Sequence, residues 1–309
     1  MAAGKTYRVA TRPSLLATTQ TRQTVDLLQK QNRDAIFEII TFSTHGDRVV
    51  DKPLVAFGGT GLFVKELEQA MIDGKADFAI HSLKDMPGIQ PDECIIASYA
   101  PRENASDILL TRNGNGITDL KAGMVVGTGS PRRQLQLQNL CPGIIFKDLR
   151  GNIDTRLRKL ETGEFDAIVL AAAGLQRLGK QIPDTAYLST GLCIPAVGQG
   201  AIALECRADD AETIALLKTI NHRETEIAVT AERAFMRTIG GGCKFPLAAH
   251  AVIDGNSVSL NAIIGTVETG NCAIITERAS IEDAEKLGIE IAGRMQKICN
   301  EKGICLVKC

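Results

Sequence analysis

The chain has 309 residues, of which 44% are hydrophobic and 23% charged, a composition typical of a globular protein with two or three domains. Lys and Arg number 35 against 36 Asp and Glu, so the net charge of −1 gives no overall field that would attract nucleic acid or a membrane surface. Aromatic residues make up only 4% and Trp is absent, which argues against the stacking platforms of nucleic-acid binders. No apolar run approaches the roughly 18 residues of a membrane span.

The nine cysteines are odd in number and show neither a CxxC pair nor zinc-ligand spacing with His. The opening Met-Ala-Ala-Gly-Lys lacks the features of a targeting sequence. Both observations predict reduced thiols, no metal site and a cytoplasmic location.

The first hundred residues alternate between strand and helix patterns. Pro13 suits the first turn of a helix that follows the first strand, and Gly74 suits the end of a second helix, whose apolar face contains Phe63, Leu67, Ala70 and Met71. Strands are expected at 7–11, 36–42, 77–80 and 94–98. This alternation predicts an α/β fold with parallel sheets.

The same alternation restarts after an irregular stretch at 99–106. Strands are expected at 107–111, 124–128, 144–148 and 166–171, with helices beginning at Pro131 and Ile153. A short echo between residues 74–80 and 163–169 favours two related lobes. A Gly- and Pro-rich stretch at 190–200 is expected to cross back between them.

The pattern changes from His222 onwards. A helix is expected to end at Gly240, followed by antiparallel strands at 248–253, 258–265 and 272–279 and a closing helix at 281–299. These elements predict a small separate α+β domain.

A polar loop, His81 to Pro87, follows the expected strand at 77–80. Lys84 and Asp85 therefore lie just past the carboxyl end of a strand, where open α/β sheets bind their ligands. A solvated turn with no function would have the same local pattern.

Arginines occur at three expected strand-to-helix junctions, although cations there oppose the helix dipole. Arg12 precedes the first helix. Arg132 and Arg133 follow a Ser130 cap and Pro131. Arg150 precedes a helix capped by Asn152, and Arg156 lies near the N-terminal end of that helix. Backbone N–H groups and guanidinium forks together form sites for carboxylates or phosphates. Because the GxxxxGK[ST] and GxGxxG patterns are absent, a polycarboxylate ligand is favoured over a nucleotide.

The last helix before the C-terminal strands leads into Gly240-Gly-Gly-Cys243. Three glycines beyond a helix end predict a loop able to carry a thiol into a cleft, where it could hold a covalent group. A helix stop followed by an ordinary small cysteine is the alternative.

Together these features resemble the porphobilinogen deaminase (hydroxymethylbilane synthase) family. The stretches that carry the resemblance run in order through nearly the whole chain: ATRPS (10–14), GLFVKELE (61–68), HSLKDMP (81–87), VGTGSPRRQ (126–134), LRGNIDTRL (149–157), FDAIVLAAAGLQRLG (165–179), PAVGQGA (195–201) and GGC (241–243).

The resemblance implies two periplasmic-binding-protein-like lobes and a small C-terminal α+β domain. The first lobe is expected to be discontinuous, at 1–100 with 200–219, the second at 105–193, and the C-terminal domain at 222–309. It also implies a monomer.

The resemblance further implies a dipyrromethane cofactor joined to Cys243 by a thioether. Four porphobilinogen molecules are added head-to-tail with loss of ammonia, and the linear tetrapyrrole hydroxymethylbilane is released, a step of porphyrin and heme biosynthesis. Asp85 takes the catalytic role in this scheme. Cofactor binding falls to Ser82, Lys84, Thr128, Ser130, Arg132 and Arg133, and substrate binding to Arg12, Ser14, Arg150, Arg156, Arg177 and Gln199.

Two stretches depart from the family pattern. Thr60 stands where Lys is common, which removes a cation from the glycine loop, and residues 102–107 replace an acidic-Pro-basic-Asp pattern at the crossing between lobes. A two-lobed, non-catalytic binding protein for a polycarboxylate is the main alternative function, but it leaves Asp85 and the Cys243 loop without a role.

Overall fold

The computed structural model describes residues 4–48, 61, 64–240 and 245–304. These residues form two compact units. Unit 1 comprises the described residues of 1–52, 60–103 and 201–226, and unit 2 those of 104–200 and 227–309. Unit 1 is therefore discontinuous in sequence.

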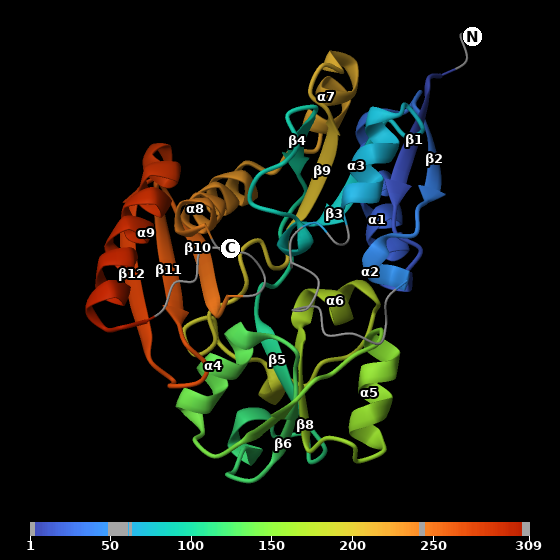
Figure 1. Ribbon diagram of the computed structural model, residues 1–309. Helices are drawn as coiled ribbons and strands as arrows, with labels where there is room; N and C mark the ends of the chain where they lie inside the picture. Colours follow the sequence, from blue (N-terminus) through green and yellow to red (C-terminus); the bar gives the residue numbers. More distant parts are fainter. Residues whose placement is uncertain (1–3, 49–60, 62–63, 241–244, 305–309) are drawn as a thin grey trace. The chain divides into compact units, whose positions relative to one another are not determined.

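Unit 1 is built on one five-stranded sheet with the order β2-β1-β3-β9-β4 (Figure 1). Its strands are β1 (Thr6–Thr11), β2 (Ile36–Thr41), β3 (Phe78–Ser82), β4 (Cys94–Tyr99) and β9 (Ile202–Arg207). The helices are α1 (Leu15–Gln31), α2 (His45–Arg48), α3 (Lys65–Ile72) and α7 (Ala211–Lys218). Leu28 of α1 and Leu217 of α7 pack on one face of the sheet, and Leu67 and Met71 of α3 on the other.

Local signals fix where the unit 1 helices begin and end. The Ser14 hydroxyl accepts a hydrogen bond from Ala17 N, so Ser14 is the N-cap of α1. Pro13 consequently precedes the cap, and its predicted place in the first helical turn is wrong. Gly74, with φ of 67°, follows the end of α3 in the left-handed region that only glycine enters at no cost.

The first part of unit 2 is a four-stranded sheet with the order β5-β8-β6-β7. Its elements are β5 (Asp107–Thr111), β6 (Val125–Gly127), α4 (Pro131–Leu140), β7 (Ile145–Lys147), α5 (Ile153–Glu161), β8 (Ala167–Ala171) and α6 (Ala172–Arg177). Leu137 of α4 packs on one face, and Leu160 of α5 and Leu175 of α6 on the other.

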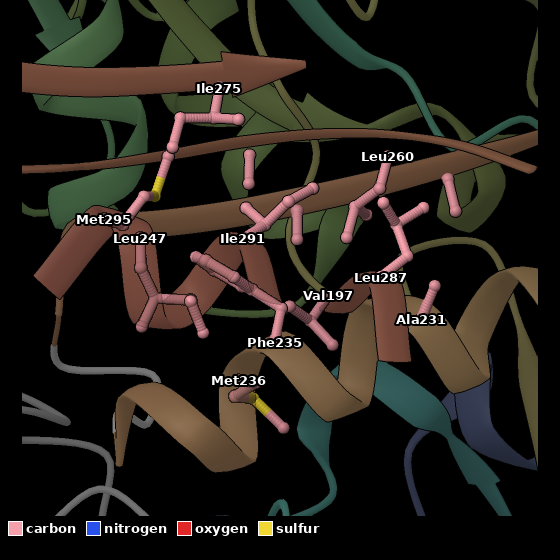
Figure 2. Close-up of a cluster of buried hydrophobic side chains, with 14 of the residues drawn as sticks. Val197, Ala231, Phe235, Met236, Leu247, Leu260, Ile275, Leu287, Ile291 and Met295 are labelled. Carbon is pink, nitrogen blue, oxygen red and sulfur yellow. The ribbon is translucent and has the colours of Figure 1, made fainter. Parts of the chain in front are cut away.

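The second part of unit 2 is a three-stranded antiparallel sheet covered by two helices. Its elements are α8 (Arg223–Ile239), which begins in unit 1, β10 (Leu247–Asp254), β11 (Ser257–Gly265), β12 (Cys272–Ser280) and α9 (Ala284–Glu301). Figure 2 shows the core between them, where Phe235 of α8 lies among Leu247, Leu287 and Ile291. The three antiparallel strands and the two helices were expected from the sequence.

The α/β class is confirmed, but the prediction of purely parallel sheets is wrong. β9 runs antiparallel to β3 and β4, and β5 runs antiparallel to β8. These two strands enter their sheets after the chain crosses between units, and a returning strand need not follow the βαβ direction. The division into three domains stays a prediction: the second lobe and the C-terminal domain have separate sheets but fall in one compact unit.

Candidate functional site

Unit 1 contains a small pocket at the carboxyl end of β3. Its volume is about 60 Å³, and four predicted site residues line it: Arg12, Ser14, Ser82 and Asp85. Gln20 and His81 contribute further polar lining. The pocket forms because β3 gives way at Leu83–Asp85 to a single 3-10 turn, which places Asp85 opposite the start of α1.

The polar groups of this pocket are held by local hydrogen bonds. Ser82 Oγ donates to Gln20 Oε1 over 3.0 Å. The Arg12 guanidinium pairs with Asp47 of α2. Burial would raise the pKa of Asp47, but hydrogen bonds from Arg12 and Thr44 outweigh it and the pKa is lowered. Asp47 therefore fixes Arg12 in the pocket wall as an ionised partner.

Lys84 lies beside Asp85 on the 3-10 turn and is half-buried. It is not among the residues that line the pocket. Its predicted contact with a cofactor stays a prediction.

A second polar feature lies in unit 2, where two predicted arginines converge on one buried carboxylate. Asp107, at the start of β5, is fully buried. It accepts hydrogen bonds from Arg132 Nη1 at 2.6 Å and from Arg133 Nη2 at 2.7 Å. Gln199 Nε2 adds a bond of 2.9 Å, and the Cys193 thiol donates at 3.4 Å. Every donor is itself buried or nearly so.

Burial and the charges of this cluster change the pKa values of Asp107 and Cys193. Burial alone would raise the pKa of Asp107, but the two arginines hold it well below its usual range. Burial, reinforced by the Asp107 charge, raises the pKa of the Cys193 thiol to about 12. Cys193 is therefore a neutral donor at physiological pH and lacks the properties of a nucleophile.

The remaining unit 2 residues lie at the junctions predicted for them. Thr128 is buried, and its hydroxyl accepts from Ser130 N at 3.2 Å. Ser130 occupies the N-cap position of α4, but its side chain makes no capping hydrogen bond, contrary to expectation. The Asn152 side chain does cap α5, accepting from Thr155 N at 2.9 Å.

Three further arginines remain partly accessible. Arg150 Nε lies 3.6 Å from Asp148 Oδ2. Arg156 Nε donates to Gly151 O at 2.8 Å, and Arg177 Nη2 donates to Gly200 O at 2.6 Å. These side chains combine a fixed position with partial exposure, which an anion-binding group needs.

The structure thus corrects the interpretation of Arg132 and Arg133 as simple cations at an open helix start. Their charge is balanced by Asp107, because two buried guanidinium groups cannot remain uncompensated. Asp47 and Asp107 were missed as partners. Asp107 could have been noticed from the sequence, because it is an acidic residue at the start of the apolar run Asp107-Ile-Leu-Leu. No sequence signal pointed to Asp47. Cys243 and Thr60 lie outside the described residues.

Two general features of the described ranges also bear on function. No helix there combines the length and apolarity needed to cross a membrane. No group of three or more His, Cys, Asp or Glu side chains within those ranges has the geometry of a metal site.

Comparisons with known proteins identify the family. Residues 7–215 match the family model described as porphobilinogen deaminase, dipyrromethane cofactor binding domain, and residues 226–297 match its C-terminal domain. The chain belongs to the porphobilinogen deaminase family.

Curated relatives named porphobilinogen deaminase agree with this assignment. The chain is 44% identical to that of Brevibacillus brevis, over 93% of this chain and 92% of the relative. It is 42% identical to that of Desulforamulus reducens, over 95% of each, and 44% identical to that of Nostoc sp., over 94% and 91%. The resemblance noted in the sequence is confirmed.

Solved structures similar to the chain include a putative methionine-binding lipoprotein of Bacillus subtilis. The TM-score is 0.45 and the identity 11%, over 71% of this chain and 90% of that one. A likeness of this size supports no statement about function, and the assignment depends on the family match.

The residues that line the pocket of unit 1 have the types of donor and acceptor that an acid-bearing dipyrromethane requires. Asp85 offers a carboxylate to pyrrole N–H groups, while Arg12 and the Ser14 hydroxyl, which only accepts from Ala17 N, offer donors to carboxylate side chains. In unit 2, Arg150 and Arg156 are more accessible to a ligand than Arg132 and Arg133, which are buried and neutralised by Asp107.

Proposed function

We propose that this chain is a transferase of porphyrin and heme biosynthesis that carries out the porphobilinogen deaminase reaction. It condenses four porphobilinogen molecules head-to-tail onto a dipyrromethane held by Cys243 and releases hydroxymethylbilane. The observation that carries the proposal is the pocket of unit 1, which Asp85 and Arg12 both line at the carboxyl end of β3, within the segment that matches the cofactor-binding domain. A binding protein without chemistry would need the arginines but not Asp85.

The reaction requires stabilisation of transient positive charge. Ammonia leaves the aminomethyl carbon of the substrate, and that carbon bonds to the free α-carbon of another pyrrole. The α-carbon that formed the new bond then loses its proton, which ammonia takes up as ammonium. Both pyrroles carry positive charge on the way, and a fixed carboxylate beside their N–H groups lowers the energy of these states. Asp85 has this position and can also accept the departing proton before it reaches ammonia.

The dipyrromethane supplies, when bound, the tethered pyrrole to which substrate units are joined. The chain's own residues orient the reacting rings. Arg12, Ser14 and Ser82 bind acidic side chains around Asp85, with Lys84 beside them. Arg150, Arg156 and Arg177 serve the same purpose on unit 2, together with Thr128 and Ser130. Arg132, Arg133 and Gln199 were expected to bind the ligand as well, but they donate to Asp107 and act by holding that buried carboxylate in place.

The cellular location and the oligomeric state of the enzyme are also proposals. We place the chain in the cytoplasm on the basis of its odd number of cysteines, and we take it to act as a monomer on the basis of the family resemblance. Porphobilinogen is its small-molecule substrate.

Replacing Asp85 with Asn tests the proposed role. The variant keeps the shape of the side chain but removes its charge, so turnover is expected to fall about 10²–10³-fold while the protein still folds. Asp92→Asn is the matched control, because Asp92 is an exposed carboxylate of the same unit outside the pocket. Initial rates of hydroxymethylbilane formation and thermal melting should be measured for both. An Asp85→Asn enzyme as fast as the control would refute the assignment.

A further inference from the structure

Three titratable side chains lie buried in unit 1 between α3 and the sheet, and one of them borders the pocket. Glu68 belongs to α3, His81 to β3 and Glu205 to β9, and their exposed fractions are 6%, 6% and 0%. Ala79 pairs with Glu205, and His81 lies two residues further along β3, so His81 and Glu205 project from the same face of the sheet. His81 Nε2 is 3.0 Å from Glu205 Oε2, and His81 also lines the pocket.

The polar atoms of this cluster are poorly satisfied. Four buried atoms have no hydrogen bond of acceptable geometry: Glu68 Oε1, the two carboxylate oxygens of Glu205, and His81 Nε2. His81 Nε2 nevertheless lies within ion-pair distance of Glu205. An ionised carboxylate in such surroundings is costly. A single imidazole can balance at most one of two carboxylates, so the other is more stable with a proton.

Glu68 is the group that keeps this proton. Burial, followed by the charge of Glu205, raises the pKa of Glu68 to about 7, while His81 and Lys65 oppose the rise. Its ionisation state therefore changes near neutral pH.

Other charged or titratable groups face the cluster from the neighbouring strands. On β9, Arg207 directs Nη1 to the carbonyl of Met71 over 3.0 Å. On β4, burial raises the pKa of Cys94 to about 12, so this thiol stays neutral. The cluster-facing position of β1 is occupied by the apolar side chain of Ala10.

We propose that Glu68, His81 and Glu205 form a proton-holding cluster that sets the charge of the pocket wall beside Arg12 and Asp85, so that loss of the Glu68 proton weakens binding of the acidic substrate. When Glu68 releases its proton to solvent, the wall becomes more negative by one unit. The added charge opposes Arg12 in attracting the substrate's carboxylates. Glu68 acts through His81 and touches no reacting atom, so it is a positioning residue.

The inference rests on the proposed function, and its test compares holoenzyme of three forms: wild type, Glu68→Gln and Asp73→Asn. Asp73 is the matched control because it is an exposed carboxylate at the end of the same helix. KM for porphobilinogen and kcat should be measured from about pH 5.5 to 8.5. In the wild type and the control, KM is expected to rise about fivefold through pH 7, because one extra negative charge near the pocket repels the acidic substrate. In Glu68→Gln it should stay level.

A second measurement is independent of activity. Folded Glu68 binds its proton more tightly than unfolded Glu68, so its contribution to stability is complete below pH 4.5 and is lost as pH rises to about 7. Urea unfolding of wild type and control should show this loss, and Glu68→Gln should lack it.

The two readouts separate the possible failures. Turnover with the same KM profile in all three forms would overturn the inference and leave the proposed function intact. Absence of porphobilinogen turnover at every pH would overturn the proposed function, and unfolding would then test the cluster alone. Equal pH dependence of unfolding in wild type and Glu68→Gln would also overturn the inference.

Discussion

Replacing Asp107 with Asn is expected to destabilise unit 2 strongly, although the change removes only one charge. The carboxylate lies between Arg132 and Arg133, and all three side chains are at most 10% exposed. In the variant the two guanidinium groups stay buried with a neutral amide in place of their counter-charge. The substitution therefore costs more than the value of one hydrogen bond.

The magnitude follows from the burial of this cluster. Removing one partner of a buried ion pair costs about 3–5 kcal/mol, because the remaining charge is neither solvated nor balanced. A loss of this size is a large fraction of the roughly 5–15 kcal/mol that holds a typical domain together. The variant should therefore fold at 25 °C but unfold at a much lower urea concentration.

Equilibrium urea unfolding at neutral pH measures the difference, with Asp254→Asn as the control. Asp254 also pairs with an arginine, Arg278, in unit 2, but these side chains are 79% and 56% exposed. An exposed pair contributes about 0–1 kcal/mol, so the control should unfold close to the wild type.

The pH dependence of unfolding provides a second check on Asp107. Because the pKa of this carboxyl is lowered in the folded state, its contribution to stability is present above the ordinary value of 3.8 and is lost as pH falls below it. Wild type should weaken on acidification in this range more than Asp107→Asn does. A cost no larger than that of Asp254→Asn, or identical acid profiles, would refute the reasoning.

Two further predictions concern the glycines of α9 and the cysteine expected to hold the cofactor. Gly288→Ala should lower the melting temperature, with a cost of at least about 1–3 kcal/mol, because the added Cβ would lie 2.2 Å from the backbone oxygen of Ala231 on α8. Gly293→Ala, on the same helix with nothing within 4 Å, should raise stability by up to about 1 kcal/mol, and equal effects of the two would contradict this packing. Cys243→Ser should yield a protein whose intact mass lacks the dipyrromethane increment present in the wild type, and a variant that retained the increment would exclude Cys243 as the attachment site.

Much of the local structure was readable from the sequence because its signals act over a few residues. Asn152 caps α5 as expected, since an N-cap bond joins residues three apart. Gly74 ends α3 for an equally local reason, its positive φ. Asp85 was correctly expected just past the end of β3, because the change from an apolar run to a Pro-bounded polar loop marks a strand end.

β9 was not among the strands expected from the sequence, and its direction was not readable either. The apolar residues that open β9, Ile202-Ala-Leu204, fit a strand of either direction, and only the return of the chain to unit 1 between β3 and β4 made it antiparallel. Periodicity reports which face of an element is apolar, and it contains no information on the neighbour that an element will pair with.

The order of amino acids alone was enough to infer most elements, the family and the types of side chain available for chemistry. Which of those side chains keep their charge available to a ligand depends instead on the folded arrangement. Arg12 and Arg132 look alike in sequence, each near the start of a helix, and each pairs with an aspartate. Arg12 beside Asp47 nevertheless lines a pocket, while Arg132 beside Asp107 is buried. The physical reason is that the energy of a charge depends on its solvation and its partners, and these come from residues distant along the chain.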